Sequence, residues 1–248
     1  MTFDTCGFFA RSIADVELIA SALRIPSDNT IPNTPFSLPG AKIGFFTSPN
    51  WPNAGPGTRN AWSKAQEILR AHGANISDIP APENFDKILD WHADILTGEG
   101  RSSFLGHYLL SQNLSPSNPD QVLSPDILRH LNNERAITTA TLNNAYDSLA
   151  ALRPIWDSLA AKYDIVITPS VVDEAPKGLE HTGDMSFCSP WTALQVPAVN
   201  LPGFKGESGL PVGLTAVGGR GRDKWVLFVC RAVGEVFERE GGWIWGRI

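Results

Sequence analysis

Several groups of polar residues could do chemistry in this sequence, and the first is the doublet Ser102-Ser103. With Glu99 and His107 nearby, the doublet could supply a hydroxyl nucleophile and a base. A nucleophilic serine, however, usually stands on a sharp glycine-rich turn that presents its hydroxyl to backbone donors. This doublet falls within or between predicted helices, which favours a structural role for both serines.

Cys188 and a group of loop acids are the next candidates. A cysteine nucleophile needs a base and surroundings that lower the pKa of its thiol. Cys188 has no local histidine, and no acid lies nearer to it than Asp184. The acids Asp173, Glu174, Glu180 and Asp184 could pair for acid–base work, although exposed loop acids are common. We favour a packing role for Cys188 and solvated positions for the acids.

The glycine-rich segment Gly218–Arg222 could cradle a phosphate, because backbone N–H groups and two arginines would face the anion. Its glycine spacing matches neither a P-loop nor a dinucleotide fingerprint, so we favour a turn with solvated arginines. The three cysteines and five histidines show no metal-ligand spacing. The residues therefore predict no metal site.

Three short apolar runs predict the strands that would position these residues. They are Ile165–Ile167, Ala198–Leu201 and Val212–Val217, and each is rich in β-branched or aliphatic residues and bounded by Pro or Gly. Pro169 and Pro202 are expected to end the first two runs, because proline cannot donate to a ladder. Ligands of α/β sheets lie beyond the carboxyl ends of strands. That rule predicts pocket walls at Thr168–Val171 and Ser186–Trp191.

The rest of the chain predicts an α/β protein. Ser12 is the expected cap of a helix that stops before Pro26. Residues 42–79 form a predicted β-α-β unit with parallel strands, whose helix begins at Thr58. Residues 85–163 are mostly helical, and 126–163 is predicted to hold two helices, broken or kinked near Pro154. A last amphipathic helix is predicted over Trp225–Glu238.

Composition narrows the function classes. The chain of 248 residues has a formal charge of −6 and no Lys/Arg run, which argues against a nucleic-acid partner. No stretch has the length of a membrane span, and the first residues do not resemble a signal peptide. Few, widely spaced cysteines suit reduced thiols, so a cytoplasmic location is expected.

Four motifs, in order along the chain, resemble the amidase signature family. FDTCGFFARSIAD resembles the family segment S-x-D-T-x-G-P-x-A-R-S-V-x-D, with Phe8 where proline is usual. YDIVITPSVVDEAP and FCSPWTALQVPAVNLP resemble two further family segments, and GLPVGLTAVGGRGRD resembles a fourth, with Thr215 where glutamine is common. The resemblance covers the chain from its first residues to the last helix.

The resemblance implies that residues 1–248 are the C-terminal part of a single amidase domain, a partial α/β/α sandwich with a mixed β-sheet flanked by helices. It implies carboxamide C–N hydrolysis without a cofactor, by a Ser–cis-Ser–Lys triad and backbone oxyanion donors. A small-molecule amide is then the expected substrate, and neither nucleic acid nor membrane is an expected partner. The oligomeric state stays open.

The catalytic motifs of the family are not found in this sequence. The family lysine and its Gly/Ser-rich nucleophile motif lie upstream of the opening segment, and neither Lys42 nor Lys64 matches that lysine. We therefore assign no catalytic residue and predict a chain that is inactive and poorly soluble alone. The alternative is a non-catalytic remnant that binds a small ligand or pairs with another subunit.

Phe187, Cys188 and Trp191 are the predicted substrate-binding residues. They form the aromatic wall that this half of the fold would offer to an aryl or alkyl amide. Core packing of Phe187 and Trp191 is an equally good interpretation.

Overall fold

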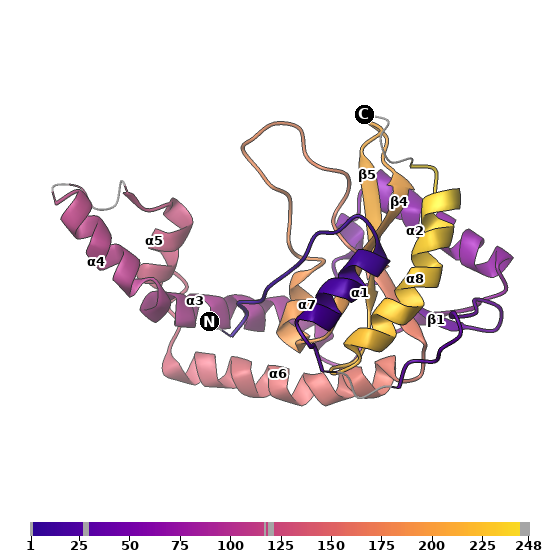
Figure 1. Cartoon of the computed structure of the whole chain (residues 1–248). Coiled ribbons are helices and arrows are strands. Elements are labelled where there is room, and N and C mark those ends of the chain that lie inside the picture. Colours follow the sequence, from indigo (N-terminus) through magenta and orange to yellow (C-terminus); the bar gives the residue numbers. More distant parts are fainter. Residues whose placement is uncertain (1, 27–29, 117, 119–121, 244–248) are drawn as a thin grey trace. The chain divides into compact units, whose positions relative to one another are not determined.

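The structure is a computed structural model that describes residues 2–26, 30–116, 118 and 122–243 (Figure 1). Its helices are α1 (Ile13–Ala22), α2 (Pro56–Ala71), α3 (Ile88–Ser103), α4 (Leu105–Leu114), α5 (Pro125–Leu131), α6 (Thr139–Ala160), α7 (Ser189–Leu194) and α8 (Asp223–Glu240). Two 3-10 turns are η1 (Trp51–Asn53) and η2 (Phe85–Lys87). The strands are β1 (Lys42–Phe46), β2 (Asn75–Ile79), β3 (Ile165–Pro169), β4 (Ala198–Lys205) and β5 (Pro211–Val217).

The chain divides into two compact units. The helical unit comprises Met1–Cys6 and Lys87–Leu152, and the sheet unit comprises Gly7–Asp86 and Arg153–Ile248. Helix α6 belongs to both, because the division falls between Leu152 and Arg153. The assignment of residues 1–248 to a single domain stays a prediction.

The five strands form one mixed sheet in the order β2-β1-β3-β5-β4. Strands β1, β2 and β3 are parallel, whereas β5 runs antiparallel to both β3 and β4. The predicted α/β fold with a mixed, helix-flanked sheet is confirmed. The carboxyl ends of β1, β3 and β4 therefore point to the same edge of the sheet.

The first face of the sheet carries the main apolar core. Phe45 of β1 and Ile167 of β3 pair in register and bury their side chains on this face. They pack in one cluster with the apolar stripes of α2 and α8, including Leu69 and Val233. Helix α1, capped by the Ser12 hydroxyl as predicted, packs against α8.

The second face carries an aromatic cluster over β1. Because successive strand side chains alternate between faces, Phe46 points away from Phe45. Its ring lies 4.9 Å from Phe85, 5.3 Å from Trp156 and 5.8 Å from Trp191, centroid to centroid. All four rings are buried, and together they are called the aromatic cluster below.

Two proline predictions were wrong. Strand β4 continues through Pro202 to Lys205, with a register shift between Pro202 and Phe204. This is possible because β4 lies at the sheet edge, where an N–H pointing away from β5 is not needed for pairing. Helix α6 likewise continues through Pro154, so the predicted break there is wrong, and a kink at Pro154 stays a prediction.

Contacts on both sides of Pro154 explain the unbroken helix. Arg153 donates to the carbonyl of Ala193 at 3.1 and 3.2 Å, and Trp156 Nε1 donates to the carbonyl of Gly218 at 3.0 Å. The two predicted helices separate instead at Asn133, whose φ is +50°. Its side chain exchanges hydrogen bonds with the backbone of Ile137 at 2.9 and 3.1 Å.

Smaller differences concern helix boundaries. Helix α2 starts at Pro56 rather than Thr58, because proline suits the first turn, where N–H groups have no helical acceptor. The Thr58 hydroxyl instead donates to the carbonyl of Val171 at 3.1 Å. Among the described residues, no helix has the length and apolar composition required to cross a membrane.

Candidate functional site

The candidate site lies at the carboxyl ends of β1 and β3, on the second face of the sheet. Thr168 of β3 is fully buried there, and its hydroxyl has no hydrogen-bond partner within the described chain. Ser48, just beyond β1, and the indole nitrogen of Trp191 are likewise buried without a partner. Buried polar atoms are nearly always hydrogen-bonded in complete proteins. These three groups therefore mark an edge at which the fold offers polar contacts that this chain does not use itself.

The segment that holds Phe187, Cys188 and Trp191 is fixed at this edge. Asn50, in the loop after β1, donates to the carbonyl of Ser186 at 3.1 Å. The rings of Phe187 and Trp191 are 1% and 2% exposed, so both side chains pack inside the protein. Trp191 also belongs to the aromatic cluster, 4.9 Å from Trp156.

Cys188 is the exposed member of the predicted wall, so the packing role favoured for it from the sequence is wrong. Its thiol donates to the carbonyl of Met185 at 3.2 Å. Partial burial of the sulfur raises the pKa of the thiol, and the nearby Asp184 carboxylate adds to the rise. A raised pKa keeps Cys188 protonated and weakens it as a nucleophile.

Three of the four loop acids, Asp173, Glu174 and Asp184, accept hydrogen bonds from backbone amides, and Glu180 is exposed. The Asp173 carboxylate fills the space beside Gly55 and Gly57, and a Cβ on either glycine would clash with its oxygens. This position, at the N-terminus of α2, suits a negative charge. The Glu174 carboxylate accepts from the amides of Ser208 at 2.9 Å and Leu210 at 3.3 Å.

Hydrogen bonds lower the pKa of two of these acids, Glu174 and Asp184, and so make them weaker bases. Hydrogen bonds from Ser208 and Leu210 lower the pKa of Glu174. Hydrogen bonding from Ser186 likewise lowers the pKa of Asp184, whose carboxylate accepts from the Ser186 amide at 2.6 Å. Carboxyls with lowered pKa values are weak bases near neutral pH.

The glycine-rich segment has internal partners for both of its arginines. Arg220 donates to Asp157 of α6 through its backbone amide at 2.9 Å and through its guanidinium at 2.7 and 2.8 Å. The guanidinium of Arg222 stacks 5.3 Å from the ring of Trp225. The segment is a turn. Arg220 is exposed and ion-paired, whereas Arg222 is partly buried against Trp225 and its Nε has no hydrogen-bond partner among the described residues.

The Ser102-Ser103 doublet lies in the last turn of α3, in the helical unit. The Ser102 hydroxyl donates to the backbone carbonyl of Glu99 at 3.0 Å. The Glu99 carboxylate is occupied elsewhere, by the Thr2 amide at 2.6 Å and the Tyr146 hydroxyl at 2.5 Å. Burial alone would raise the pKa of Glu99, but these hydrogen bonds lower it. The structural role favoured for Ser102 agrees with these contacts.

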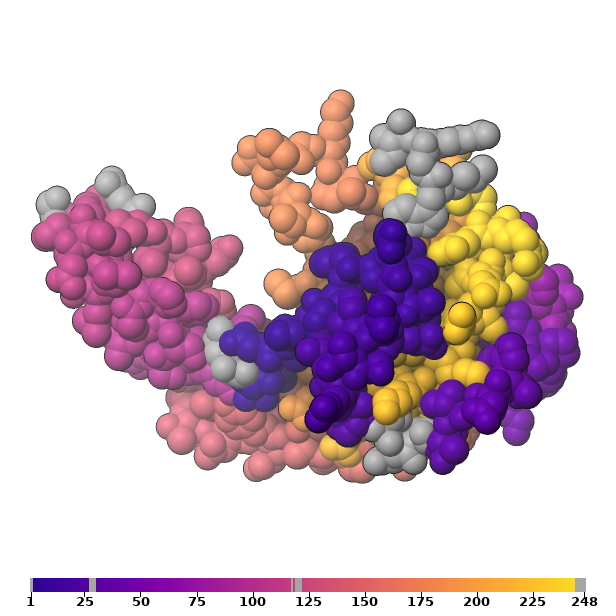
Figure 2. All heavy atoms as spheres, viewed as in Figure 1, coloured from indigo at the N-terminus to yellow at the C-terminus, as the bar shows by residue number. Residues whose placement is uncertain are grey.

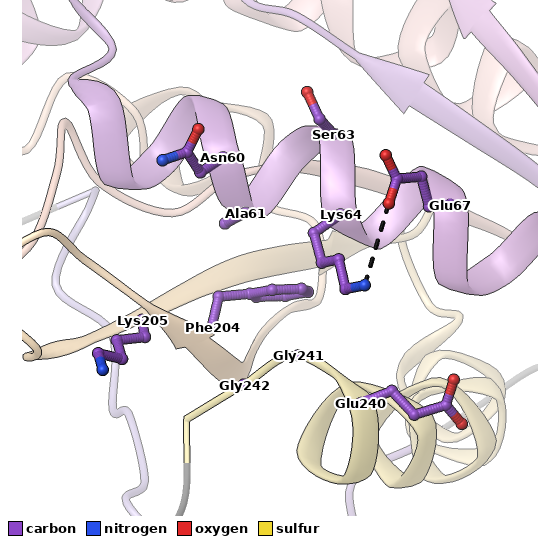
Figure 3. A pocket seen from close by; sticks show the side chains of 10 residues that line it. All are labelled: Asn60, Ala61, Ser63, Lys64, Glu67, Phe204, Lys205, Glu240, Gly241 and Gly242. Carbon is purple, nitrogen blue, oxygen red and sulfur yellow. Dashed lines mark ion pairs between the residues drawn. The ribbon is translucent and has the colours of Figure 1, made fainter.

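A pocket of about 420 Å³ opens on the side of the sheet covered by α2 (Figure 3). Lys64 and Glu67 of α2 form an ion pair of 3.9 Å, and Lys205 and Glu240 also line the pocket. In Figure 3 the hydroxyl of Ser63 points away from the Lys64 ammonium. The pocket lining therefore combines charges of both signs, and Lys64 is not placed as a base beside the Ser63 hydroxyl.

A polar row across the second face was not predicted from the sequence. Thr168, Thr215 and Asn200 stand side by side on β3, β5 and β4. The Ser170 hydroxyl, just beyond β3, lies 2.7 Å from both Asn200 Oδ1 and Thr215 Oγ1. One signal was present in the sequence: each of the three strands carries a polar side chain within or at the end of an otherwise apolar run.

The candidate site presents hydrogen-bonding groups of several kinds. It offers hydroxyls, an indole N–H and a side-chain amide, and the buried hydroxyls of Ser48 and Thr168 have no hydrogen-bond partner among the described residues. A hydroxyl nucleophile is normally activated by a hydrogen-bonded base. Among the described residues, no group of three or more metal-ligating side chains comes together either.

The match to a known family covers most of this chain. A family model described as Amidase matches residues 1–227. The chain belongs to the amidase family. One subunit of the mitochondrial glutamyl-tRNA(Gln) amidotransferase of Mus musculus is 22% identical over 93% of this chain and 51% of its own length. The same subunit from Rattus norvegicus is 23% identical over the same shares.

Solved structures give the same fold. A crystal structure of an amidase has a TM-score of 0.69 at 22% identity, covering 90% of this chain and 50% of its own. Fatty acid amide hydrolase has a TM-score of 0.66 at 18% identity, covering 93% of this chain and 48% of its own. This amidase-family chain thus spans about half the length of the relatives that it matches.

Proposed function

We propose that this chain is the C-terminal part of a carboxamide C–N hydrolase whose Ser–cis-Ser–Lys triad lies in a complementary part of the amidase fold. The observation that carries the proposal is the coverage: over 90% of this chain matches about half of a full amidase. The absence of a family-type nucleophile motif from the sequence agrees with that coverage. In this proposal the complementary part attacks the amide carbonyl, and the half described above shapes the site.

The proposed contribution of this half is the wall of the substrate pocket. Cys188 would contact the substrate directly, since it is the exposed member of the wall. The buried rings of Phe187 and Trp191 would support that surface from below, because a packed aromatic floor holds a pocket in shape. No cofactor is required by this mechanism, and a cytoplasmic location is part of the same proposal.

Exposed apolar side chains support the need for a complement. Phe9 and Leu179 are almost completely exposed in the sheet unit. Leu179 belongs to the loop between β3 and α7, which projects as the thin orange segment in Figure 2. In this proposal Phe9 and Leu179 are contact residues for the complement, because exposed apolar side chains mark an interaction site where they gather in one patch.

An amide-hydrolysis assay tests the proposal. The purified 248-residue chain is expected to give no turnover of aryl or alkyl amides above background, because its hydroxyls have no base. Addition of a complementary polypeptide that carries the Gly/Ser-rich motif is expected to give turnover. Turnover by the 248-residue chain alone would refute the proposal.

A subunit-pairing protein without catalysis is the second candidate. The observation in its favour is the name of the curated relatives, which are described as subunits of an amidotransferase. A stable complex with the complementary polypeptide that hydrolyses no amide would favour this candidate over the first.

A further inference from the structure

The second face of the sheet is covered over β1 and open over β4. The aromatic cluster, contributed by β1, α6, α7 and the η2 turn, buries Phe46 completely. At the other end of the same face, Ala198 and Asn200 of β4 are exposed and Pro202 is half-buried. The opposite side of β4 is not open, because Leu201 and Phe204 are buried in the core beneath α8. The opening is therefore confined to one face of one edge strand.

Contacts within the chain hold the side chains of this open area in place. Asn200 lies flat over Gly213 of β5, where an added Cβ would clash with the Asn200 side-chain oxygen. Ser170 holds that oxygen at 2.7 Å and lies 2.7 Å from the Thr215 hydroxyl. A side chain fixed by two neighbouring strands and a glycine has lost most of its rotamer freedom before any partner binds.

The hydrogen bonds also orient the amide of Asn200. A serine hydroxyl has a single hydrogen, so Ser170 donates to Asn200 Oδ1 and accepts from Thr215 Oγ1. The two N–H groups of Asn200 are then the donors that remain, and they have no acceptor among the described residues. Ala198, an exposed apolar residue, lies on the same face of β4 as Asn200. The surface thus presents two oriented donors beside apolar groups.

We propose that this surface, formed by Ser170, Ala198, Asn200 and Pro202 and called the β4 surface below, is where the complementary half of the amidase fold docks. The inference rests on the proposed function. The occupant is a polypeptide, because the relatives continue for about as many residues as this chain already supplies. Its backbone carbonyl oxygens are the acceptors that Asn200 fits, since a packed second layer over a sheet must satisfy such groups.

The test uses the 248-residue chain with a polypeptide that supplies the other half of an amidase, including the Gly/Ser-rich motif. Hydrogen–deuterium exchange is measured on the chain alone and in the complex. We expect at least about tenfold slower exchange in the segments 170–172 and 198–203, since covered and hydrogen-bonded amides exchange through rarer openings. Segments of α2, on the first face, are expected to be unchanged.

A pair of matched variants sharpens the result. Asn200→Asp replaces both donors by an acceptor and is expected to weaken association about tenfold or more. Asn60→Asp makes the same charge change on the exposed side of α2 and is expected to leave association unaltered. Ser170→Ala, which frees the Asn200 amide without removing it, is expected to give a smaller loss.

The possible outcomes distinguish a failure of the docking inference from a failure of the proposed function. If the complex forms but the β4 surface is not protected, or if Asn200→Asp binds as well as Asn60→Asp, the docking inference is wrong and the proposed function stands. If no such polypeptide associates and none restores amide hydrolysis, the proposed function and the docking inference both fail. Protection at the β4 surface by a small amide alone, without the polypeptide, would overturn the choice of occupant.

Discussion

The two faces of the sheet differ in how completely this chain covers them. On the first face, α2 and α8 bury side chains from β1 to β4 in one continuous core. On the second face, the aromatic cluster covers β1, whereas Asn200 on β4 stays exposed. This chain therefore covers the first face of the sheet with helices and leaves the second face open over β4.

The first face stabilises the fold, and the second face carries the candidate site. Burial of apolar area on the first face accounts for folding, because such burial is the main favourable contribution to stability. The second face holds some of the buried polar groups without partners, including the Thr168 hydroxyl and the Trp191 indole nitrogen. In this account the function of the chain depends on what covers that face.

The largest expected effects come from the adjacent residues Phe45 and Phe46, which point to opposite faces. Both rings are buried, so Phe45→Ala and Phe46→Ala should each lower the free energy of unfolding by about 3–5 kcal/mol. Urea denaturation of the isolated chain measures both. A cost below about 1 kcal/mol for Phe46→Ala would show that the aromatic cluster is not a closed layer.

A second comparison uses the neighbours Leu201 and Asn200 on β4. Leu201 is buried on the first face, so Leu201→Ala should cost about 2–5 kcal/mol of stability. Asn200→Ala on the open face should change the stability of the isolated chain by less than about 0.5 kcal/mol. Thermal unfolding of the two variants checks this, and equal losses would mean that both sides of β4 are covered.

An intermediate effect is expected for the contact between α6 and the glycine-rich turn. Asp157→Ala removes the acceptor of the Arg220 amide and guanidinium and should cost about 1–3 kcal/mol. Asp126→Ala is the control, because its pair with Arg129 is a surface contact within α5 and should contribute less than about 0.5 kcal/mol. Similar losses in urea denaturation would contradict the anchoring role of Asp157.

The smallest expected effect is a pH dependence on the covered face. His72, after α2, lies 2.9 Å from the Glu240 carboxylate of α8, and this contact and Arg239 lower the pKa of Glu240. A lowered carboxyl pKa contributes stability above the ordinary glutamate pKa, and the contribution is lost as pH falls through the lowered value. Stability of the wild type should therefore decrease more steeply below about pH 4.5 than that of His72→Ala. Parallel stability curves for the two proteins would show that the contact contributes nothing.

The sequence predicted the elements better than the site. Apolar runs located β3, β4 and β5, and the Ser12 cap located α1. Pro154 and Pro202 misled the prediction, because tertiary contacts and an edge position overrode the local preference of proline. Local rules cannot anticipate either effect, since both depend on neighbours that are distant in sequence.

The polar row was missed for a related reason. Ser170, Asn200 and Thr215 are ordinary residues in the sequence and become a hydrogen-bonded group only through strand register. Phe187, Cys188 and Trp191 were proposed from their place after a strand, and their contact with substrate stays a prediction. The site as a whole could not be derived, because the residues that form it come from separate parts of the sequence and meet only through the fold.

Native mass spectrometry of the protein isolated from its source tests the central claim most directly. The account predicts that the 26.9 kDa sequence occurs in a particle of about twice that mass, either as one longer chain or with a second, different polypeptide. A particle of 26.9 kDa, or a pair of identical 26.9 kDa chains, would contradict the claim that a complementary half completes this fold.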